Sequence, residues 1–341
     1  MKSLLAALGM VFITVPVSAQ TCSWKQTDPA DEIGASRTQT PEKALEATRL
    51  VKSGKVHSLA HVYDKASIPR PFDRVFELTV SIFDMDEAGP SQTFTEGTLN
   101  GQIGQVGTQF DALGHGGHDL GSYNCIAQSD IGPDEAGLLR KLDNSSVVPF
   151  FTRAVFLDFV NHSEVPKTTV EGGSIVENSY VITVNDIERV LEAEQVAPPG
   201  RGDVVIFYTG WDRLFGTDND RLAFAPGPGI EAARWLADRE VALVGADTMS
   251  IEAIDDAQGV EVKADPAILG AELGAIPFPL HFILLTQHGI HLLENMKLTP
   301  LADDLMASQA SGDGAYEFLF TFAPLPIKGM EGSPGQPLAV R

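Results

Sequence analysis

Two carboxamides, a carboxylate and an imidazole lie within eleven residues of one glycine-rich stretch, as Gln105, Gln109, Asp111 and His115. These side chains can reach one point if the backbone runs extended and then turns at Gly114. Carboxylate and amide oxygens together with imidazole nitrogen are typical ligands of a divalent metal of intermediate hardness. The stretch therefore predicts a metal or substrate site, and the alternative is a glycine-rich loop with solvated polar groups.

A second group of candidate ligands lies far downstream, at the two ends of an apolar segment. His281 precedes this segment and Glu294 follows it. Taken alone, His281 has the surroundings of a hydrogen-bonded core histidine, and Glu294 those of a surface carboxylate or a cap. His288 and His291 lie between them, and we expect both to be exposed or structural.

Together the two stretches resemble the cyclase family, which includes bacterial kynurenine formamidase and isatin hydrolase. The family motif His-x-Gly-Thr-His-x-Asp-x-x-x-His is followed by a distant His and by a Glu before Asn. The chain shows this order at 105–115 and then at His281, Glu294 and Asn295. The resemblance extends over about residues 70 to 340, with further matches at 199–205, 209–211, 226–230, 244–248 and 324–334. This order is what leads us to interpret His281 and Glu294 as site residues.

The chain departs from the family motif at two positions, where Gln105 and Gln109 replace histidines. Glutamine at the second position also occurs in longer members of the family, so the chain resembles that subgroup. A carboxamide oxygen is a neutral, weaker and harder donor than an imidazole nitrogen. The replacement therefore favours Mn²⁺, or even Mg²⁺ or Ca²⁺, more than the zinc members of the family would suggest.

The resemblance implies a site that holds one or two divalent ions, Mn²⁺ or Zn²⁺, with Asp111 as the bridging carboxylate if there are two. By the same resemblance His115 is the general base, which takes a proton from water and returns it to the leaving nitrogen. A neutral imidazole with a pKa near 6.5 suits both transfers. The predicted metal ligands are Gln105, Gln109, Asp111, His281 and Glu294.

Together with these residues, the resemblance implies a metal-dependent hydrolase of a cyclic or aryl amide, such as a formamide, an imide or a lactam. Two alternatives remain: an exported binding protein without catalysis, and a polyketide-type cyclase or dehydratase. The sequence has no Gly-x-Ser-x-Gly elbow, no phosphate loop, no dinucleotide fingerprint and no Cys-x-x-Cys pair. Four aromatic residues could line an apolar substrate pocket, although each also suits the core: Phe72, Phe110, Trp211 and Phe278.

Composition limits the partners of this 341-residue chain. Its formal net charge of -22, without any Lys/Arg run, argues against binding to nucleic acid. Hydrophobic content of 43% and charged content of 21% are values of a globular protein. We expect a small-molecule substrate, and the family resemblance implies a homodimer or homotetramer.

Residues 1–19 have the features of a signal peptide. Lys2 supplies the positive start, an apolar run follows at 4–15, and small residues at 17–19 provide a cleavage site. We expect a periplasmic or secreted protein that starts near Gln20 and leaves the membrane after cleavage; the alternative is an uncleaved anchor helix. In an oxidising compartment Cys22 and Cys125 are expected to form a disulfide, and the alternative is two free, buried thiols.

The remaining pattern predicts an α/β fold. Residues 20–69 form an N-terminal extension with one helix, which starts at Thr40-Pro41, and residues 70–341 form the catalytic domain. Strands are predicted at 75–83, 153–160, 203–208, 241–245 and 316–322. A helix is predicted from 183, with a capping box of Asn185 and Glu188, and another at 230–239. The resemblance implies a mixed, β-barrel-like sheet flanked by helices, as in swivelling β/β/α folds.

Overall fold

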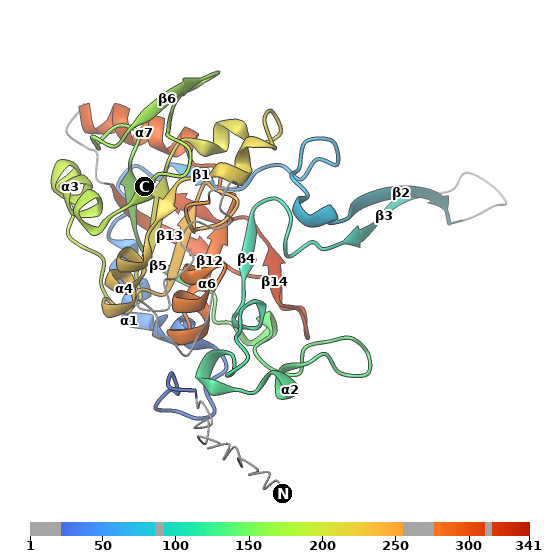
Figure 1. The fold of residues 1–341 in the computed structure, drawn as a ribbon. Coiled ribbons are helices and arrows are strands. Elements are labelled where there is room, and N and C mark those ends of the chain that lie inside the picture. Colours follow the sequence, from blue (N-terminus) through green and yellow to red (C-terminus); the bar gives the residue numbers. More distant parts are fainter. Residues whose placement is uncertain (1–21, 86–91, 255–275, 311–315) are drawn as a thin grey trace, which may run out of the picture.

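The structure, a computed structural model, describes residues 22–85, 92–254, 276–310 and 316–341. The predicted signal peptide lies outside these residues. The described chain is organised around one nine-stranded mixed sheet that curls into a half-barrel and has few helices around it (Figure 1), which confirms the predicted fold class. In spatial order the strands are β1 (Val56–Ser58), β15 (Leu338–Val340), β13 (Glu317–Phe322), β5 (Phe150–Asp158), β9 (Val204–Tyr208), β11 (Leu243–Ala246), β12 (His291–Glu294), β4 (Gln109–Asp111) and β14 (Gly332–Pro334).

The centre of the sheet is parallel and its two sides are antiparallel. Strands β5, β9, β11 and β12 run in the same direction, and the pairs outside them are antiparallel. Every residue of β9 and β11 is buried, which is typical of parallel strands covered on both faces. The strands predicted at 153–160, 203–208, 241–245 and 316–322 are present as β5, β9, β11 and β13.

The helices cover parts of this sheet without enclosing it. The predicted first helix begins as expected, because Thr40 caps it by accepting a hydrogen bond from the Lys43 amide. The predicted capping box of the next long helix was wrong by two residues: Thr183 and Asp186 form it, since the helix begins two residues earlier than Asn185 requires. No helix among the described residues is long and apolar enough to cross a membrane. The helices are α1 (Pro41–Thr48), α2 (Gln128–Ile131), α3 (Val184–Glu194), α4 (Ile230–Asp238), α6 (Pro279–His281) with the π-helical turn η9 (Phe282–Gln287), and α7 (Thr299–Ala310).

Shorter elements connect these parts. Two small pairs of strands lie outside the main sheet: β8 (Val181–Ile182) with β10 (Gly227–Pro228), and β6 (Lys167–Val170) with β7 (Gly173–Val176). The 3₁₀ turns are η1 (Gly34–Thr38), η2 (Pro71–Asp73), η3 (Leu113–His115), η4 (Tyr123–Cys125), η5 (Asn144–Ser146), η6 (Trp211–Leu214) and η7 (Arg221–Phe224).

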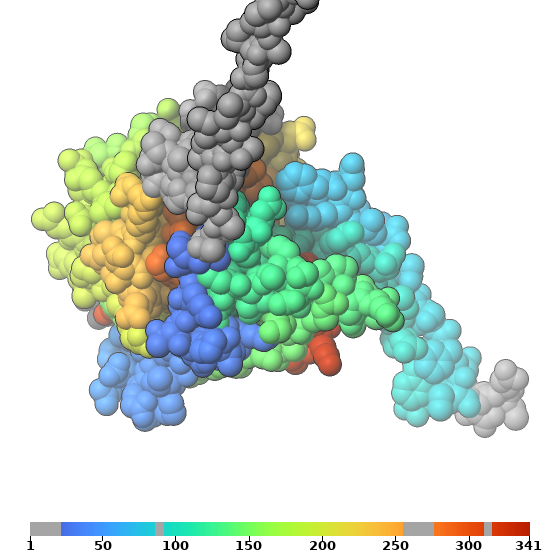
Figure 2. All heavy atoms as spheres, turned by 60° about the horizontal axis from the view of Figure 1, so that its bottom comes forward, coloured from blue at the N-terminus to red at the C-terminus, as the bar shows by residue number. Residues whose placement is uncertain are grey.

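One hairpin projects from the body of the molecule. It consists of β2 (Phe76–Asp84) and β3 (Thr93–Gly101), and Figure 2 shows it extending away from the rest of the chain. The strand predicted at 75–83 is therefore present, but only Phe76 among the hairpin residues is buried. Exposed apolar side chains, among them Leu78, Val80 and Ile82, alternate along β2 and so share one face.

The predicted disulfide between Cys22 and Cys125 is confirmed. It joins the start of the described chain to η4, which follows the first motif. Hydrogen bonds support the same junction: the Trp24 indole donates to the Ser122 carbonyl, and the Asn124 side chain donates to the Asp28 carbonyl.

Replacing Cys22 and Cys125 together by serine should lower the free energy of unfolding by about 2–4 kcal/mol, because the bond restricts the unfolded chain over a separation of 103 residues. Urea denaturation of the oxidised protein and of the double variant measures the difference. The reduced wild-type protein is the control and should unfold like the variant. An unchanged midpoint in both would contradict the prediction.

Candidate active site

Strand β4 carries the centre of the site. Strand β4 lies between β12 and β14 in the sheet. Because side chains alternate along a strand, Gln109 and Asp111 share one face, and Phe110 points to the other face and is buried in the core. The register places Gln109 opposite Glu294, the last residue of β12. Gly107 lets the preceding loop approach closely: its φ is +65°, and a Cβ atom there would lie 3.0 Å from the Tyr63 ring.

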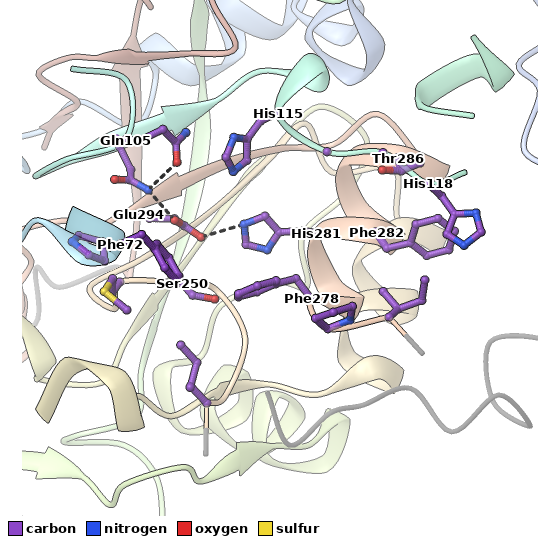
Figure 3. Close-up of a pocket in the computed structure, with 18 of the residues that line it drawn as sticks. Phe72, Gln105, His115, His118, Ser250, Phe278, His281, Phe282, Thr286 and Glu294 are labelled. Carbon is purple, nitrogen blue, oxygen red and sulfur yellow. Dashed lines mark hydrogen bonds and ion pairs between the residues drawn. The ribbon is translucent and has the colours of Figure 1, made fainter. Parts of the chain in front are cut away.

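His281 completes the arrangement from the other side. It ends α6, and its Nε2 lies 3.6 Å from Asp111 Oδ2 and 3.4 Å from Glu294 Oε1. His115, at the end of η3, offers a ring nitrogen within 4.8 Å of ligand atoms of Asp111 and His281. The structure therefore brings residues from two distant parts of the sequence to one place, and Figure 3 shows His115, His281 and Glu294 around it.

The two glutamines lie in the same cluster and donate hydrogen bonds to its carboxylates. Gln105 Nε2 lies 2.6 Å from Asp111 Oδ1, and Gln109 Nε2 lies 2.9 Å from Glu294 Oε2. A longer contact of 3.5 Å links Gln109 Nε2 to Gln105 Oε1. In this arrangement each glutamine holds one oxygen of a carboxylate, and the other oxygen of each carboxylate faces His281. A role of Gln105 and Gln109 as direct metal ligands stays a prediction.

Glu252 is a site residue that the sequence reasoning missed. Its carboxylate oxygens lie 2.7 and 2.9 Å from His281 Nδ1, and one of them also accepts the His281 backbone amide at 2.8 Å. The Ser250 hydroxyl donates to the same carboxylate at 2.6 Å. The carboxylate on Nδ1 fixes the imidazole ring so that Nε2 faces the other candidate ligands. A carboxylate in this position is a common partner of metal-binding histidines. In the sequence, Glu252 is an acidic residue shortly after the stretch 244–248 that resembles the family. Its spacing from His281 gives no indication that the two residues are in contact.

The Glu252→Gln variant should weaken divalent-metal binding about 10- to 100-fold, because an amide orients the His281 ring less firmly and makes it less basic. Titration of the metal-free protein against a chromogenic chelator measures the affinity. The Glu240→Gln variant is a matched control, since Glu240 is 61% exposed and pairs with Arg201 on the surface. Equal metal affinities in the wild type and the Glu252 variant would contradict a positioning role.

The cluster fits a divalent cation. Asp111 Oδ2 is buried and has no hydrogen-bond partner within the described structure. The 3.4 and 3.6 Å separations from His281 Nε2 resemble the spacing of about 3.4 Å between two ligands that each lie ~2.1 Å from one ion in a tetrahedral site. A cation bound at this point would give Asp111 Oδ2 the partner that it lacks.

Electrostatics agree with this fit. Burial raises the pKa of Glu294 well above its usual value, and the Asp111 charge adds to the shift. Burial would also raise the pKa of Asp111, but the charges of His115 and His281 and the hydrogen bonds from His281 and Gln105 outweigh it, so its pKa is lowered. For His281, burial is the largest single cause and favours the neutral form, yet the charges of Glu252 and Glu294 and the hydrogen bonds to Asp111 and Glu252 together outweigh it, so the pKa lies well above its usual value. Both raised pKa values mark groups that hold a proton more firmly than usual at this cluster, and a bound cation would compete with those protons for the same atoms.

A cavity of about 900 Å³ opens onto the cluster. Its floor includes Gln105, Gln109, His115, His281 and Glu294. Its walls are largely apolar and include Phe72, Met249, Ile254, Ile276, Phe278 and Phe282.

Two of the four aromatic residues expected in a pocket, Phe72 and Phe278, line this cavity, whereas Phe110 and Trp211 are fully buried in the core. His118 and Asp119 also line the cavity, and neither belongs to a metal-ligand group among the described residues. His291 is structural, as expected: it is fully buried, and its nitrogens lie 3.3 and 3.2 Å from the Asp111 and Ile33 carbonyls.

Comparison with known proteins identifies the class. The model of the family described as "Putative cyclase" matches residues 12–253, so the chain belongs to this family. The match includes the first motif and Glu252 but ends before His281 and Glu294. The predicted resemblance to the cyclase family is confirmed.

Solved structures agree with this assignment. A structure described as a novel cyclase is 26% identical, with a TM-score of 0.73, and the alignment covers 93% of this chain and 97% of the other. Isatin hydrolase A from Ralstonia solanacearum is 20% identical, with a TM-score of 0.55 and coverage of 84% and 91%. An isatin hydrolase bound to the product analogue thioisatinate is 19% identical, with a TM-score of 0.50 and coverage of 88% and 98%. At these identities the two isatin hydrolases show a shared fold only. No curated protein gives a significant match.

Proposed function

We propose that the protein is a metal-dependent hydrolase of a C–N bond in a cyclic or aryl amide, such as a formamide, an imide or a lactam. The observation that carries this proposal is the convergence of Asp111, His281 and Glu294, with His115 beside them, on the floor of a largely apolar cavity. Membership of the cyclase family and the fold shared with isatin hydrolases support it.

Asp111, His281 and Glu294 would hold the cation, with Glu252 orienting the imidazole. Gln105 and Gln109 would join the ligand set if their carboxamide oxygens turned toward the ion. We expect Mn²⁺ or Zn²⁺, and the carboxylate-rich set favours Mn²⁺. When bound, such an ion lowers the pKa of water and polarises a carbonyl group.

The chain's own residues then perform the proton transfers and the positioning. His115 takes a proton from the attacking water as the new C–O bond forms, and returns it to the nitrogen as the C–N bond breaks. Phe72 and Phe278 lie on the cavity wall beside Ser250, next to the Glu294–His281 pair (Figure 3), where they would contact an aromatic ring. The products are a carboxylic acid and an amine.

One observation favours a second candidate, an exported ligand-binding protein without catalysis. The carboxamides of Gln105 and Gln109 already donate hydrogen bonds to Asp111 and Glu294, which partly satisfies both carboxylates without any ion. Such a protein would bind small molecules in the same cavity and would not turn them over.

The experiment that separates these candidates starts with elemental analysis of protein purified without added metal. The metal-free protein is then supplied with Mn²⁺ or Zn²⁺ and assayed with N-formylkynurenine, isatin and simple imides. Metal-dependent ring opening or release of formate is expected. Tight ligand binding without turnover would favour the binding protein, and a dehydrated product would favour the polyketide-type cyclase. Failure to bind any transition metal would overturn the proposed hydrolase.

We also propose that the protein is exported and that it assembles as a homodimer or homotetramer. The N-terminal sequence and the Cys22–Cys125 disulfide support export. The exposed apolar face of β2 supports assembly, because a two-stranded hairpin alone in water is marginally stable. N-terminal sequencing of the mature protein should give a start near Gln20, and light scattering should give a mass of two or four chains.

A further inference from the structure

The segment 71–74 lines the cavity with three of its four residues, Pro71, Phe72 and Arg74. Phe72 lines the cavity and is 78% exposed, and its φ is +58°. Asp73 follows with a φ of +57°. Positive φ is rare for a bulky residue and costs energy, and such strained residues cluster at binding and active sites. An exposed phenyl ring held in this way at a cavity mouth is suited to contact a ligand.

Arg74 lies in the same segment and also lines the cavity. Its Nη1 donates to the Gln105 carbonyl at 2.6 Å, which ties the guanidinium to the loop that carries the candidate metal ligands. Its Cζ lies 5.4 Å from the centre of the Phe72 ring. The remaining N–H donors of the guanidinium have no hydrogen-bond partner among the described residues, and they can bind a ligand in the cavity that Arg74 lines.

Arg74 carries a positive charge that is not paired with a described carboxylate, although the chain is strongly acidic. The sequence has 46 acidic residues and only 24 lysines and arginines, yet no acidic side chain among the described residues forms an ion pair with Arg74. Its hydrogen-bond partner is a backbone carbonyl, so no carboxylate of the described residues compensates the positive charge. A planar guanidinium in this state is a binding group for a carboxylate, which it can engage through two parallel hydrogen bonds.

From these observations we propose that Arg74 and Phe72 form an anion subsite and that the substrate of the cavity is an aryl amide carrying a carboxylate. Phe72 contacts the ring, Arg74 binds the carboxylate, and the amide carbon reaches the floor between His115 and His281. The inference rests on the proposed function, and it adds the charge of the substrate and the residue that selects it.

The test compares two amides that differ by one carboxylate, formanilide and 2-formamidobenzoate, in the metal-loaded protein. The ratio of their kcat/KM values should favour the anion in the wild type and fall about 10- to 100-fold in Arg74→Gln, mainly through KM, because a charge-assisted pair is lost. Arg74→Lys should recover part of the ratio, since lysine keeps the positive charge but lacks the planar guanidinium that can form two parallel hydrogen bonds. The Arg201→Gln variant, which changes a 61% exposed arginine, is the control and should keep the wild-type ratio. An unchanged ratio in Arg74→Gln would overturn the subsite.

A binding measurement separates failure of the subsite from failure of the proposed function. Benzoate is titrated calorimetrically into wild type and Arg74→Gln of equal metal content, so that any contact with the ion is the same in both. At least tenfold weaker binding to the variant supports the subsite even if neither formamide is hydrolysed. Equal binding contradicts the subsite whatever the activity.

Discussion

The His115→Ala variant should lose about 10²- to 10⁴-fold in kcat while it retains its metal, because the imidazole moves protons and the ion has other ligands. His115 takes no part in the hydrogen bond between His281 and Glu252 or in the ion pair between His281 and Glu294. Steady-state kinetics with the amide that the protein hydrolyses, together with elemental analysis, measures both quantities.

The control for this experiment is His118→Ala, which removes another imidazole from the cavity wall. We expect a much smaller loss of kcat, since His118 belongs to no metal-ligand group among the described residues. A loss below tenfold in His115→Ala would rule out its role as general base.

The Asp111→Asn variant should abolish both measurable turnover and tight metal binding. Asp111 is fully buried, accepts a hydrogen bond from Gln105, and directs its remaining oxygen toward His281. Asparagine keeps the size of the side chain but removes the negative charge that the cation requires. Elemental analysis and the amide assay, run on the same samples, measure the two losses.

The matched control is Asp220→Asn, which removes one negative charge from an exposed position. Thermal unfolding of both variants shows whether the fold persists, so that loss of metal can be distinguished from loss of structure. An Asp111→Asn protein that folds, binds metal as tightly as the wild type and remains active would refute the proposed site.

Much of the fold was predictable because its signals are local. The central strands consist of short buried runs rich in Val, Ile and Phe, and the first helix begins at a Thr-Pro pair that both caps and starts it. The capping box at Thr183 and Asp186 was misplaced because Asn185 and Glu188 have the same spacing, and spacing alone does not show where the helix begins.

The site was predictable only where it repeats the family's order of residues. The approach of His281 to Asp111 and Glu294 follows that order, and the structure shows the contacts. The link between Glu252 and His281 spans 29 residues through tertiary packing, so no periodicity reveals it. The direction of the two glutamine amides depends on which neighbours accept hydrogen bonds, which again is set by the folded structure.

The antiparallel pairing of β4 with both β12 and β14 has a consequence for how this site can change. Inserting or deleting one residue in this three-residue strand would turn Phe110 toward the cavity and Asp111 toward the core. Exchanging a side chain in place leaves this register unchanged. Histidine and glutamine codons differ only in their third base, so two such changes, at positions 105 and 109, separate this protein's cluster from the histidine version of the family. The cluster can therefore exchange imidazole for carboxamide by point mutation alone, on an unaltered scaffold.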